Sequence, residues 1–381
     1  MKHTSKIGVA GLSVTLALAL AACSGNTDST TSASPTSDAT VSAGIVAKGE
    51  AAAKAAGGST TLPSKTVGWV YYGANGIASQ RSYNGLKAAA DAIGWKTKAC
   101  DGAGVPAKMQ ACASNLLNQG VDALIVNTID TATMADAIKQ STAKGVPMIS
   151  IGGSIETSKG YAASYAPDEA GMGSALGKYI ADTLGSAGGG VIEQTFPAKF
   201  ATLRTDAMEA AYAGTSVKVV NKFDADPVDL AAATQKQTAA GLNAHSDAKA
   251  VTMVFSTAEI GASQAIIAKY GAGKAFPQRP LLTTYYANLP VIKMIRDGQL
   301  DAAAENPLEW CGWVAIDQLA ENFARKTPIS TDERPSYGTD TDFWRPTVVT
   351  KDNLPAEGQL LAPAVDFAGF FTAKWDAEFK N

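Results

Sequence analysis

Two kinds of segment alternate along the chain from Lys65 onward, and this alternation limits the fold more than any other feature. Short runs rich in β-branched and aromatic residues are followed by longer stretches whose apolar residues recur at helical spacing. This order predicts parallel strands covered by helices, because a parallel connection needs a crossover segment that is usually helical. The run Ala123–Asn127 is almost wholly apolar, which is typical of a strand buried on both faces. We therefore expect an α/β fold with parallel sheets.

The alternation occurs twice, with a break near Gly153. The first set begins with a strand at Lys65–Tyr72 and ends with one at Pro147–Ile151, and the second set runs from a helix at Glu169–Leu184 to another at Leu289–Arg296. A chain of 381 residues is long enough for two domains. We expect two Rossmann-like lobes. The expected boundaries are residues 63–153 with about 306–327 for lobe 1, and residues 154–305 with part of 328–381 for lobe 2.

The N-terminal segment has the features of an export signal. Lys2 and Lys6 precede a mostly apolar stretch, Ile7–Ala22, which is short and interrupted for a transmembrane helix. The stretch leads into Leu20-Ala21-Ala22-Cys23, which resembles a bacterial lipobox, in which the cysteine is acylated after cleavage. We expect residues 1–22 to be a lipoprotein signal peptide and Cys23 to carry lipid, with an ordinary secretory signal as the alternative. The Ser-, Thr- and Ala-rich stretch that follows predicts a flexible linker over residues 23–62.

Cysteine usage fits an exported protein. Cys100 and Cys112 fall at the end of an expected strand and inside the next helix. They either form a disulfide in an oxidising compartment or remain two free thiols. Cys311 has no evident mate, and the absence of a CxxC motif excludes a zinc knuckle.

Composition and motifs exclude several classes of function. The formal net charge is −3 at pH 7 without runs of like charge, so we expect no nucleic-acid partner. The two histidines are His3, in the signal, and His245, so a multi-histidine metal site is excluded. The sequence lacks GxSxG, GxxxxGK[ST], HExxH and a GxGxxG after the first strand. We expect no enzyme activity, no cofactor and no metal. A hydrolase would lack a nucleophile–base pair.

Several short sequence blocks occur together between about Lys65 and Arg325. The block from Gln119 to Ile151 is specific as a whole. The other matching motifs are Gly94-Trp95, Asp101-Gly102, Pro106, Arg204, Gly261-Ala262, Asp297-Gly298 and Glu305-Asn306-Pro307. In this combination the chain resembles the substrate-binding lipoproteins of bacterial ABC importers. These are type I periplasmic binding proteins, and the best-known members of the cluster bind ribose and other sugars.

The resemblance implies both a fold and a function. Known members consist of two lobes joined by three hinge strands, and they hold the ligand in the cleft between the lobes. In open parallel sheets ligands lie beyond the carboxyl ends of the strands, so two such ends that face each other make a closable cavity. We expect a monomeric receptor on the outer face of the cell membrane that delivers a small molecule to an importer permease. A receptor of the same fold coupled to a membrane signalling protein is the alternative.

The resemblance also places the ligand residues, and there this chain departs from the sugar-binding pattern. Gly152-Gly153 stand where sugar binders carry Asp-Arg, and Phe255-Ser256 replace Asn-Asp. Tyr286 replaces an aspartate and Glu305 replaces the hinge glutamine, while Arg204 is retained. The candidate ligand residues are Tyr72, Asn75, Gly152, Gly153, Arg204, Ser256, Tyr286, Glu305 and Trp310. We expect a less polar cleft whose ligand stacks on an aromatic ring and presents an anionic or carbonyl group to Arg204. A sugar also fits, because aromatic rings stack on pyranose faces.

Each candidate also has a structural interpretation. Tyr72 and Asn75 fit an ordinary turn, and Gly152-Gly153 fit a hinge that needs free backbone angles. Arg204 fits a solvated helix surface. Tyr286 and Trp310 fit core packing, and Glu305 fits a hydrogen-bond acceptor in the hinge.

Overall fold

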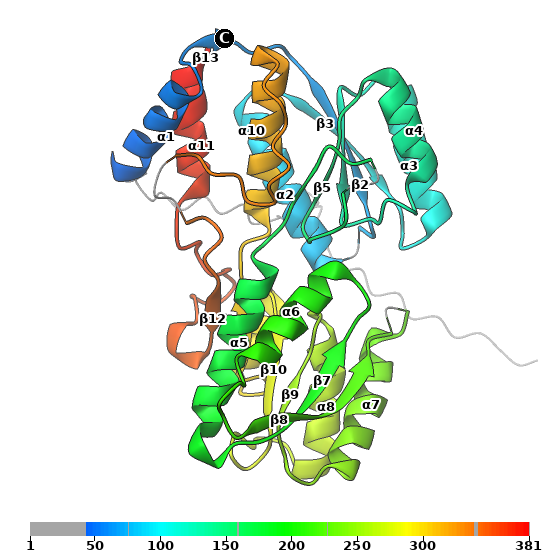
Figure 1. The fold of residues 1–381 in the computed structure, drawn as a ribbon. Coiled ribbons are helices and arrows are strands. Elements are labelled where there is room, and N and C mark those ends of the chain that lie inside the picture. Colours follow the sequence, from blue (N-terminus) through cyan, green and yellow to red (C-terminus); the bar gives the residue numbers. More distant parts are fainter. Residues whose placement is uncertain (1–42, 75, 158–159, 227, 339–341, 381) are drawn as a thin grey trace, which may run out of the picture. The chain divides into compact units, whose positions relative to one another are not determined.

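Parallel pairing dominates both large sheets of the protein, as the alternating pattern predicts (Figure 1). The computed structural model describes residues 43–74, 76–157, 160–226, 228–338 and 342–380. The first sheet contains, in spatial order and all parallel, β3 (Lys96–Asp101), β2 (Thr66–Tyr71), β4 (Ala123–Asn127), β5 (Met148–Ile151) and β6 (Ala163–Tyr165). The second contains β12 (Thr347–Val349), β11 (Ala302–Glu305), β10 (Leu281–Tyr285), β9 (Ala248–Thr252), β7 (Gly189–Thr195) and β8 (Val217–Asp224). Only β12 is antiparallel to its neighbour in that sheet.

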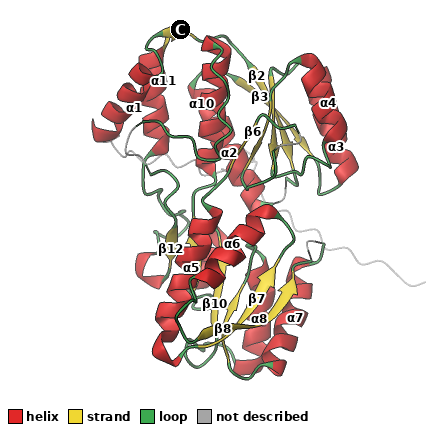
Figure 2. Cartoon of the chain, in the orientation of Figure 1, coloured by secondary structure: helices red, strands yellow, loops and turns green. Residues whose placement is uncertain are grey.

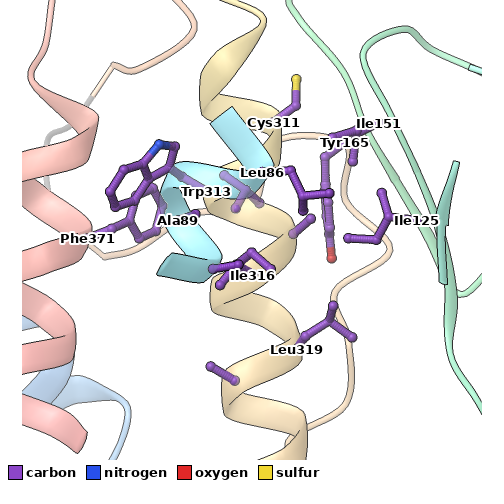
Figure 3. Packing of buried hydrophobic residues seen from close by; sticks show 14 of the residues in the cluster. Leu86, Ala89, Ile125, Ile151, Tyr165, Cys311, Trp313, Ile316, Leu319 and Phe371 are labelled. Carbon is purple, nitrogen blue, oxygen red and sulfur yellow. The ribbon is translucent and has the colours of Figure 1, made fainter. Parts of the chain in front are cut away.

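Helices cover both faces of the first sheet, which we call lobe 1 (Figure 2). Helices α2 (Ile77–Ala92) and α10 (Glu309–Arg325) lie on one face, and α3 (Pro106–Asn118) and α4 (Ala135–Lys144) on the other. On the first face Leu86 of α2, Ile316 of α10 and Ile125 of β4 belong to one buried apolar cluster (Figure 3). Pro106 supplies the first turn of α3, where its missing N–H costs nothing, and Gly145 ends α4 with a left-handed φ of 65°.

The second sheet, lobe 2, is covered in the same way. Helices α5 (Glu169–Leu184) and α6 (Lys199–Ala210) lie on one face. On the other face lie α7 (Leu230–Ala244), α8 (Ala258–Tyr270) and α9 (Leu289–Arg296). Buried apolar side chains such as Met172 and Ile266 fill these two interfaces.

Helices α2 and α10 cross at an unusually close distance. A Cβ atom on Gly85 would lie 2.1 Å from the carbonyl oxygen of Glu309, and one on Gly312 would lie 2.2 Å from the amide nitrogen of Leu86. Real Cβ contacts are never this short, so glycine is required at both positions for the two backbones to touch. The contact fixes the start of α10 against the middle of α2.

The N-terminal segment differs from the expected linker. Residues 23–62 were predicted to be flexible, but residues 43–62 contain α1 (Ala43–Ala55) and β1 (Thr60–Thr61). Helix α1 packs against α11 (Phe367–Glu378), and β1 pairs with β13 (Phe379–Lys380). The small residues that indicated a linker allow this contact, since a Cβ on Gly49 would lie 2.5 Å from the carbonyl oxygen of Phe370. The predicted signal peptide, Cys23 and Asn75 lie outside the described residues.

The lobe boundaries also differ from the expected ones in two places. Strand β6 pairs with β5 in lobe 1, although residues 154–165 were assigned to lobe 2. The C-terminal tail serves both lobes, because β12 joins the lobe 2 sheet while α11 packs on α10 of lobe 1. The resemblance implied three connections between the lobes, without their positions. In the described part of the chain, residues 166–168, 306–308 and 326–338 with 342–346 lead from one lobe to the other, and residues 350–366 add a further connection.

The open question about the cysteines has an answer in the structure. Cys100 and Cys112 form a disulfide that joins β3 to α3, with a Cα–Cα distance of 5.5 Å. Cys311 is a buried free cysteine. Among the helices that the structure describes, none is long and apolar enough to cross a membrane.

A buried ionic cluster fastens α11 to α10. The ammonium group of Lys374 donates to Asp317 at 2.8 Å, to Glu321 at 2.7 Å and to Glu378 at 2.6 Å. The three carboxylates lie within 4.8 Å of one another, so the lysine charge between them offsets their repulsion. Trp375 donates its indole N–H to Asp317 at 2.8 Å.

We predict that Lys374→Met destabilises the protein by about 3–5 kcal/mol, because it leaves buried carboxylates without their common cation. Urea unfolding at neutral pH measures the change. The control is Lys87→Met, which removes an exposed pair with Asp91 and should cost less than about 0.5 kcal/mol. Equal effects of the two substitutions would contradict a stabilising role for the cluster.

Candidate functional site

The predicted ligand residues of lobe 1 lie where strands end. Tyr72 follows β2, and its side chain is 46% exposed. Gly152 and Gly153 follow β5, and Gly152 has a φ of 98° that favours glycine. A Cβ on Gly152 would lie 2.9 Å from both Asn127 Nδ2 and Ser82 Oγ. Both the backbone angle and the lack of space for a Cβ atom favour glycine at position 152. The hinge interpretation and the ligand-contact interpretation both agree with this.

Lobe 2 contributes its own set of strand ends. Ser256 follows β9, Tyr286 follows β10, and Glu305 is the last residue of β11. Tyr286 has a φ of 63°, a strained value for a tyrosine that the surrounding structure must enforce. Parallel strands place these residues at one edge of the sheet.

Arg204 lies at the centre of the first buried cluster. Its Nε donates to Glu169 Oε2 at 2.7 Å, one terminal nitrogen donates to the carbonyl oxygen of Val254 at 2.9 Å, and the other donates to the hydroxyl of Tyr286 at 2.8 Å. Arg204 is 2% exposed and Glu169 is 1% exposed. We call Arg204, Glu169 and Tyr286 the Arg204 cluster.

The charges in this cluster balance each other. Burial raises the pKa of Glu169, and the neighbouring Arg204 counteracts that shift in part. The sequence analysis expected Arg204 to meet an anionic or carbonyl group of the ligand. In the structure its charge is already paired with Glu169 at 2.7 Å, so an incoming anion would meet a neutral ion pair instead of a free cation.

Aromatic rings surround the cluster. The guanidinium carbon of Arg204 lies 5.1 Å from the ring centre of Phe200, 4.7 Å from that of Tyr285 and 4.9 Å from that of Tyr286. Phe200 also packs with Phe196 and Phe255, at centre distances of 6.2 and 5.8 Å. Lobe 2 thus presents aromatic surface beside its paired charges.

Lobe 1 approaches the Arg204 cluster through the glycine turn. A Cβ on Gly153 would lie 3.7 Å from Glu169 Oε1 and 2.9 Å from Thr128 Cγ2. Gly153 of lobe 1 therefore lies close to the carboxylate of Glu169 in lobe 2.

Glu305 belongs to a second buried cluster, which we call the Arg81 cluster: Arg81, Asn288, Glu305 and Glu309. Glu305 Oε1 accepts from Arg81 at 2.8 Å, and Oε2 accepts from the amide of Ala287 at 2.6 Å. Both oxygens of Glu305 are therefore engaged by the protein, in agreement with the structural interpretation of this residue. Asn288 donates to the hydroxyl of Ser256 at 3.3 Å, which links Ser256 to the same cluster.

Two predicted residues are not brought into either cluster. Trp310 is fully buried in lobe 1, where its indole N–H donates to Asn306 at 3.2 Å and its ring packs on Trp344. This is the core role that the sequence left open. Tyr72 lies apart from both clusters, and its carbonyl oxygen accepts from Gly104.

Sequence reasoning missed Glu169, Arg81, Asn288 and Glu309. Glu169 follows the N-cap Asp168, and an acidic residue in a first helical turn is a common complement to the helix dipole. Arg81 offered a weak signal, because it lies four residues before Gly85 on the buried face of α2.

One further buried carboxylate is perturbed. Glu193 lies in β7 with no exposed surface, and burial together with the nearby Glu209 raises its pKa to about 8.

Comparison with known proteins identifies relatives of the whole two-lobed region. A family model described as periplasmic binding protein domain matches residues 67–327. The chain is 28% identical over 234 residues to the ribose import binding protein of Bacillus subtilis, covering 61% of this chain and 73% of that protein. It is 32% identical over 80 residues to the xylitol-binding protein of Mycolicibacterium smegmatis, covering 21% of this chain and 23% of that protein.

Solved structures share the fold. A solute-binding protein of an ABC transporter from Mycobacterium smegmatis, with bound glycerol, superposes with a TM-score of 0.64 at 22% identity, over 79% of this chain and 100% of that one. The Caulobacter myo-inositol binding protein, bound to myo-inositol, gives a TM-score of 0.64 at 18% identity, over 76% of this chain and 94% of that one. These matches confirm the predicted fold class. All of these proteins are named as binding proteins, in agreement with the prediction that the chain is not an enzyme.

We predict that the free energy of unfolding falls as the pH rises from about 4.5 to about 8, in part because of Glu193. The folded state holds the Glu193 proton to a higher pH than the unfolded state does, so folding is favoured below this window and loses stability within it. Glu193→Gln mimics the protonated form. It should match the wild type near pH 5 and exceed it by about 2–4 kcal/mol at pH 8.

Urea unfolding at both pH values measures this difference. The control is Asp182→Asn, which removes an exposed partner of Lys178 and should change stability by less than about 0.5 kcal/mol at either pH. A Glu193→Gln variant that is less stable than the wild type at pH 8 would refute the assignment.

Proposed function

Because the chain belongs to the periplasmic binding protein family, we propose that it is the extracytoplasmic receptor of an ABC importer and holds one small molecule between its two lobes. The observation that carries the proposal is the approach of Gly153 of lobe 1 to Glu169 of lobe 2, which is itself paired with Arg204. Ligands of open α/β sheets lie beyond the carboxyl ends of the strands, which is where these residues lie. The named relative from Bacillus subtilis is an import binding protein, which favours a transport partner over a signalling one.

We infer that the ligand is a neutral sugar or polyol. The cation of the Arg204 cluster is paired with Glu169, and the cation of the Arg81 cluster lies between two carboxylates. An anionic ligand would lose its hydration without gaining an unpaired positive charge. A neutral polyhydroxylated molecule can donate hydrogen bonds to carboxylate oxygens and place its apolar face on the aromatic rings of Phe200 and Phe255. Ribose, xylitol, glycerol and myo-inositol, which the relatives' names contain, all belong to this class.

We also propose that the receptor works as a monomer tethered to the membrane. The motif Leu20-Ala21-Ala22-Cys23 supports removal of residues 1–22 and acylation of Cys23. The Ser-, Thr- and Ala-rich composition after Cys23 supports a tether.

We predict that neutral polyols raise the melting temperature of the purified protein while charged analogues do not. Thermal shift with D-ribose, xylitol, glycerol and myo-inositol, compared with ribose 5-phosphate and gluconate, measures the effect. Any ligand that co-purifies is released by denaturation and identified by mass spectrometry. Stabilisation by the charged compounds alone would contradict the neutral-ligand proposal, and no response together with no co-purified ligand would contradict the receptor itself.

The Arg204 cluster supplies the matched variant for this test. Arg204→Lys retains the charge beside Glu169 but loses the forked geometry, and it should weaken binding of the responding polyol about tenfold or more. Arg345→Lys alters an exposed arginine, which is 68% exposed and paired with Asp342, and should leave binding unchanged.

We predict that Cys23→Ser moves the protein from the membrane fraction to the soluble fraction, because the acceptor of the lipid is lost. Fractionation of cells and the intact mass of the mature protein measure this. Cys311→Ser, at a buried cysteine, is the control and should stay in the membrane fraction. A wild-type protein without lipid mass at Cys23 would contradict the anchor.

A further inference from the structure

Arg81 uses all of its hydrogen-bonding capacity in one place. Its Nε donates to Glu309 Oε1 at 2.7 Å, and one terminal nitrogen donates to Glu305 Oε1 at 2.8 Å and to Glu309 Oε2 at 2.9 Å. The other terminal nitrogen donates to Asn288 Oδ1 and to Glu305 Oε2, both at 3.3 Å. A guanidinium group has five N–H donors, so every one of them is engaged. Arg81 is 7% exposed.

These partners come from both lobes. Arg81 lies on α2 and Glu309 opens α10, both in lobe 1, whereas Glu305 ends β11 and Asn288 precedes α9 in lobe 2. Residues 306–308 between the two glutamates are one of the connections between the lobes. The Arg81 side chain therefore bonds the residues on both sides of this connection, Glu309 in lobe 1 and Glu305 in lobe 2.

The same side chain also supports the turn that carries Tyr286. Glu305 Oε2 accepts from the amide of Ala287 as well as from Arg81, and Asn288 accepts from Arg81. Tyr286 lies directly before these two residues and holds a φ of 63°. A strained residue keeps such an angle only where its neighbours are fixed. Arg81 bonds Asn288 directly and holds Ala287 through Glu305.

We propose that Arg81 is a positioning residue that couples the separation of the two lobes to the conformation of the Tyr286 turn. The proposal rests on the proposed function, because it assigns the Arg81 cluster a role in how that receptor opens and binds. In this arrangement, movement of lobe 2 away from α2 breaks the bonds from Arg81 to Glu305 and Asn288 but not those to Glu309. Loss of these bonds releases the Tyr286 hydroxyl from Arg204, so the lobe arrangement and the Arg204 cluster change together.

The charge balance explains why arginine is needed. Arg81 lies between the buried carboxylate of Glu305, 3% exposed, and the half-buried carboxylate of Glu309, so its removal leaves two negative groups near each other without their common cation. A lysine restores the charge but donates from a single nitrogen, so it cannot serve Glu309, Glu305 and Asn288 together. Arg81→Lys therefore tests the hydrogen-bond geometry of the arginine while the positive charge is retained.

The test compares Arg81→Lys with Arg279→Lys in the full chain. Arg279 is an equally buried arginine that pairs with Asp301 at 2.5 Å entirely within lobe 2. Small-angle X-ray scattering of each protein without ligand, and with D-ribose or xylitol at saturating concentration, reports the separation of the lobes. Isothermal titration with the same two compounds reports affinity, and urea unfolding reports stability.

We expect Arg81→Lys to increase the ligand-free radius of gyration and broaden the pair-distance distribution, and to weaken binding about two- to thirtyfold. Arg279→Lys should lower stability while leaving both the scattering and the affinity as in the wild type. Equal stability losses in the two variants, with unchanged scattering, would overturn the proposal. If Arg81→Lys does not fold, Glu305→Gln breaks the lobe 2 ion pair alone and must produce the same scattering change.

The scattering of the ligand-free proteins decides the proposal without any ligand. If neither D-ribose nor xylitol binds the wild type, the proposed function is wrong about these two ligands. The scattering of the ligand-free proteins still tests the role of Arg81 in that case. If both bind and the Arg81→Lys scattering is unchanged, the receptor stands and the coupling role is wrong.

Discussion

The backbone of α10 touches the backbone of α2 at Gly85, and the charged groups between the lobes depend on that contact. Because glycine at this position lets the carbonyl of Glu309 approach within reach, Arg81, one turn earlier on α2, faces the Glu309 side chain. Any larger residue at Gly85 would push α10 outward and separate these groups. The absence of a side chain at Gly85, where α2 and α10 cross, thus determines where the buried guanidinium group of Arg81 lies.

The Arg81 and Arg204 clusters use the same arrangement. In each, a buried arginine on a helix binds a carboxylate from a different element and also engages the segment that follows β10. Buried ion pairs add little net stability compared with apolar packing, but they penalise any arrangement in which a charge is left alone. The two clusters therefore define relative positions of the elements more than they increase stability. They also leave both arginines paired with carboxylates, which is the physical basis for a neutral ligand.

The sequence predicted the fold well and the site only in part. Apolar residues at helical spacing identified helices such as α5, and a continuous apolar run identified strand β4, because each of these signals lies within one segment of the sequence. The residues of strand β6 were assigned to the wrong lobe because a strand of three residues is too short to show an alternating hydrophobic pattern. The residues of α1 were predicted to be a linker because the partner of this helix, α11, is near the other end of the chain. Arg204 and Tyr286 were found by resemblance, and they do lie together. Glu169 was missed, since an acidic residue in a first helical turn is common, and only the three-dimensional fold brings it to Arg204.

The pairing of β1 with β13, and of α1 with α11, has a consequence for biosynthesis. The first folded segment to be made has no partner until the ribosome has completed the last helix and strand. The contacts of α1 with α11 and of β1 with β13 consequently cannot form while the chain is still being translated. The contacts of α1 and β1 are therefore among the last tertiary contacts of lobe 1 to form.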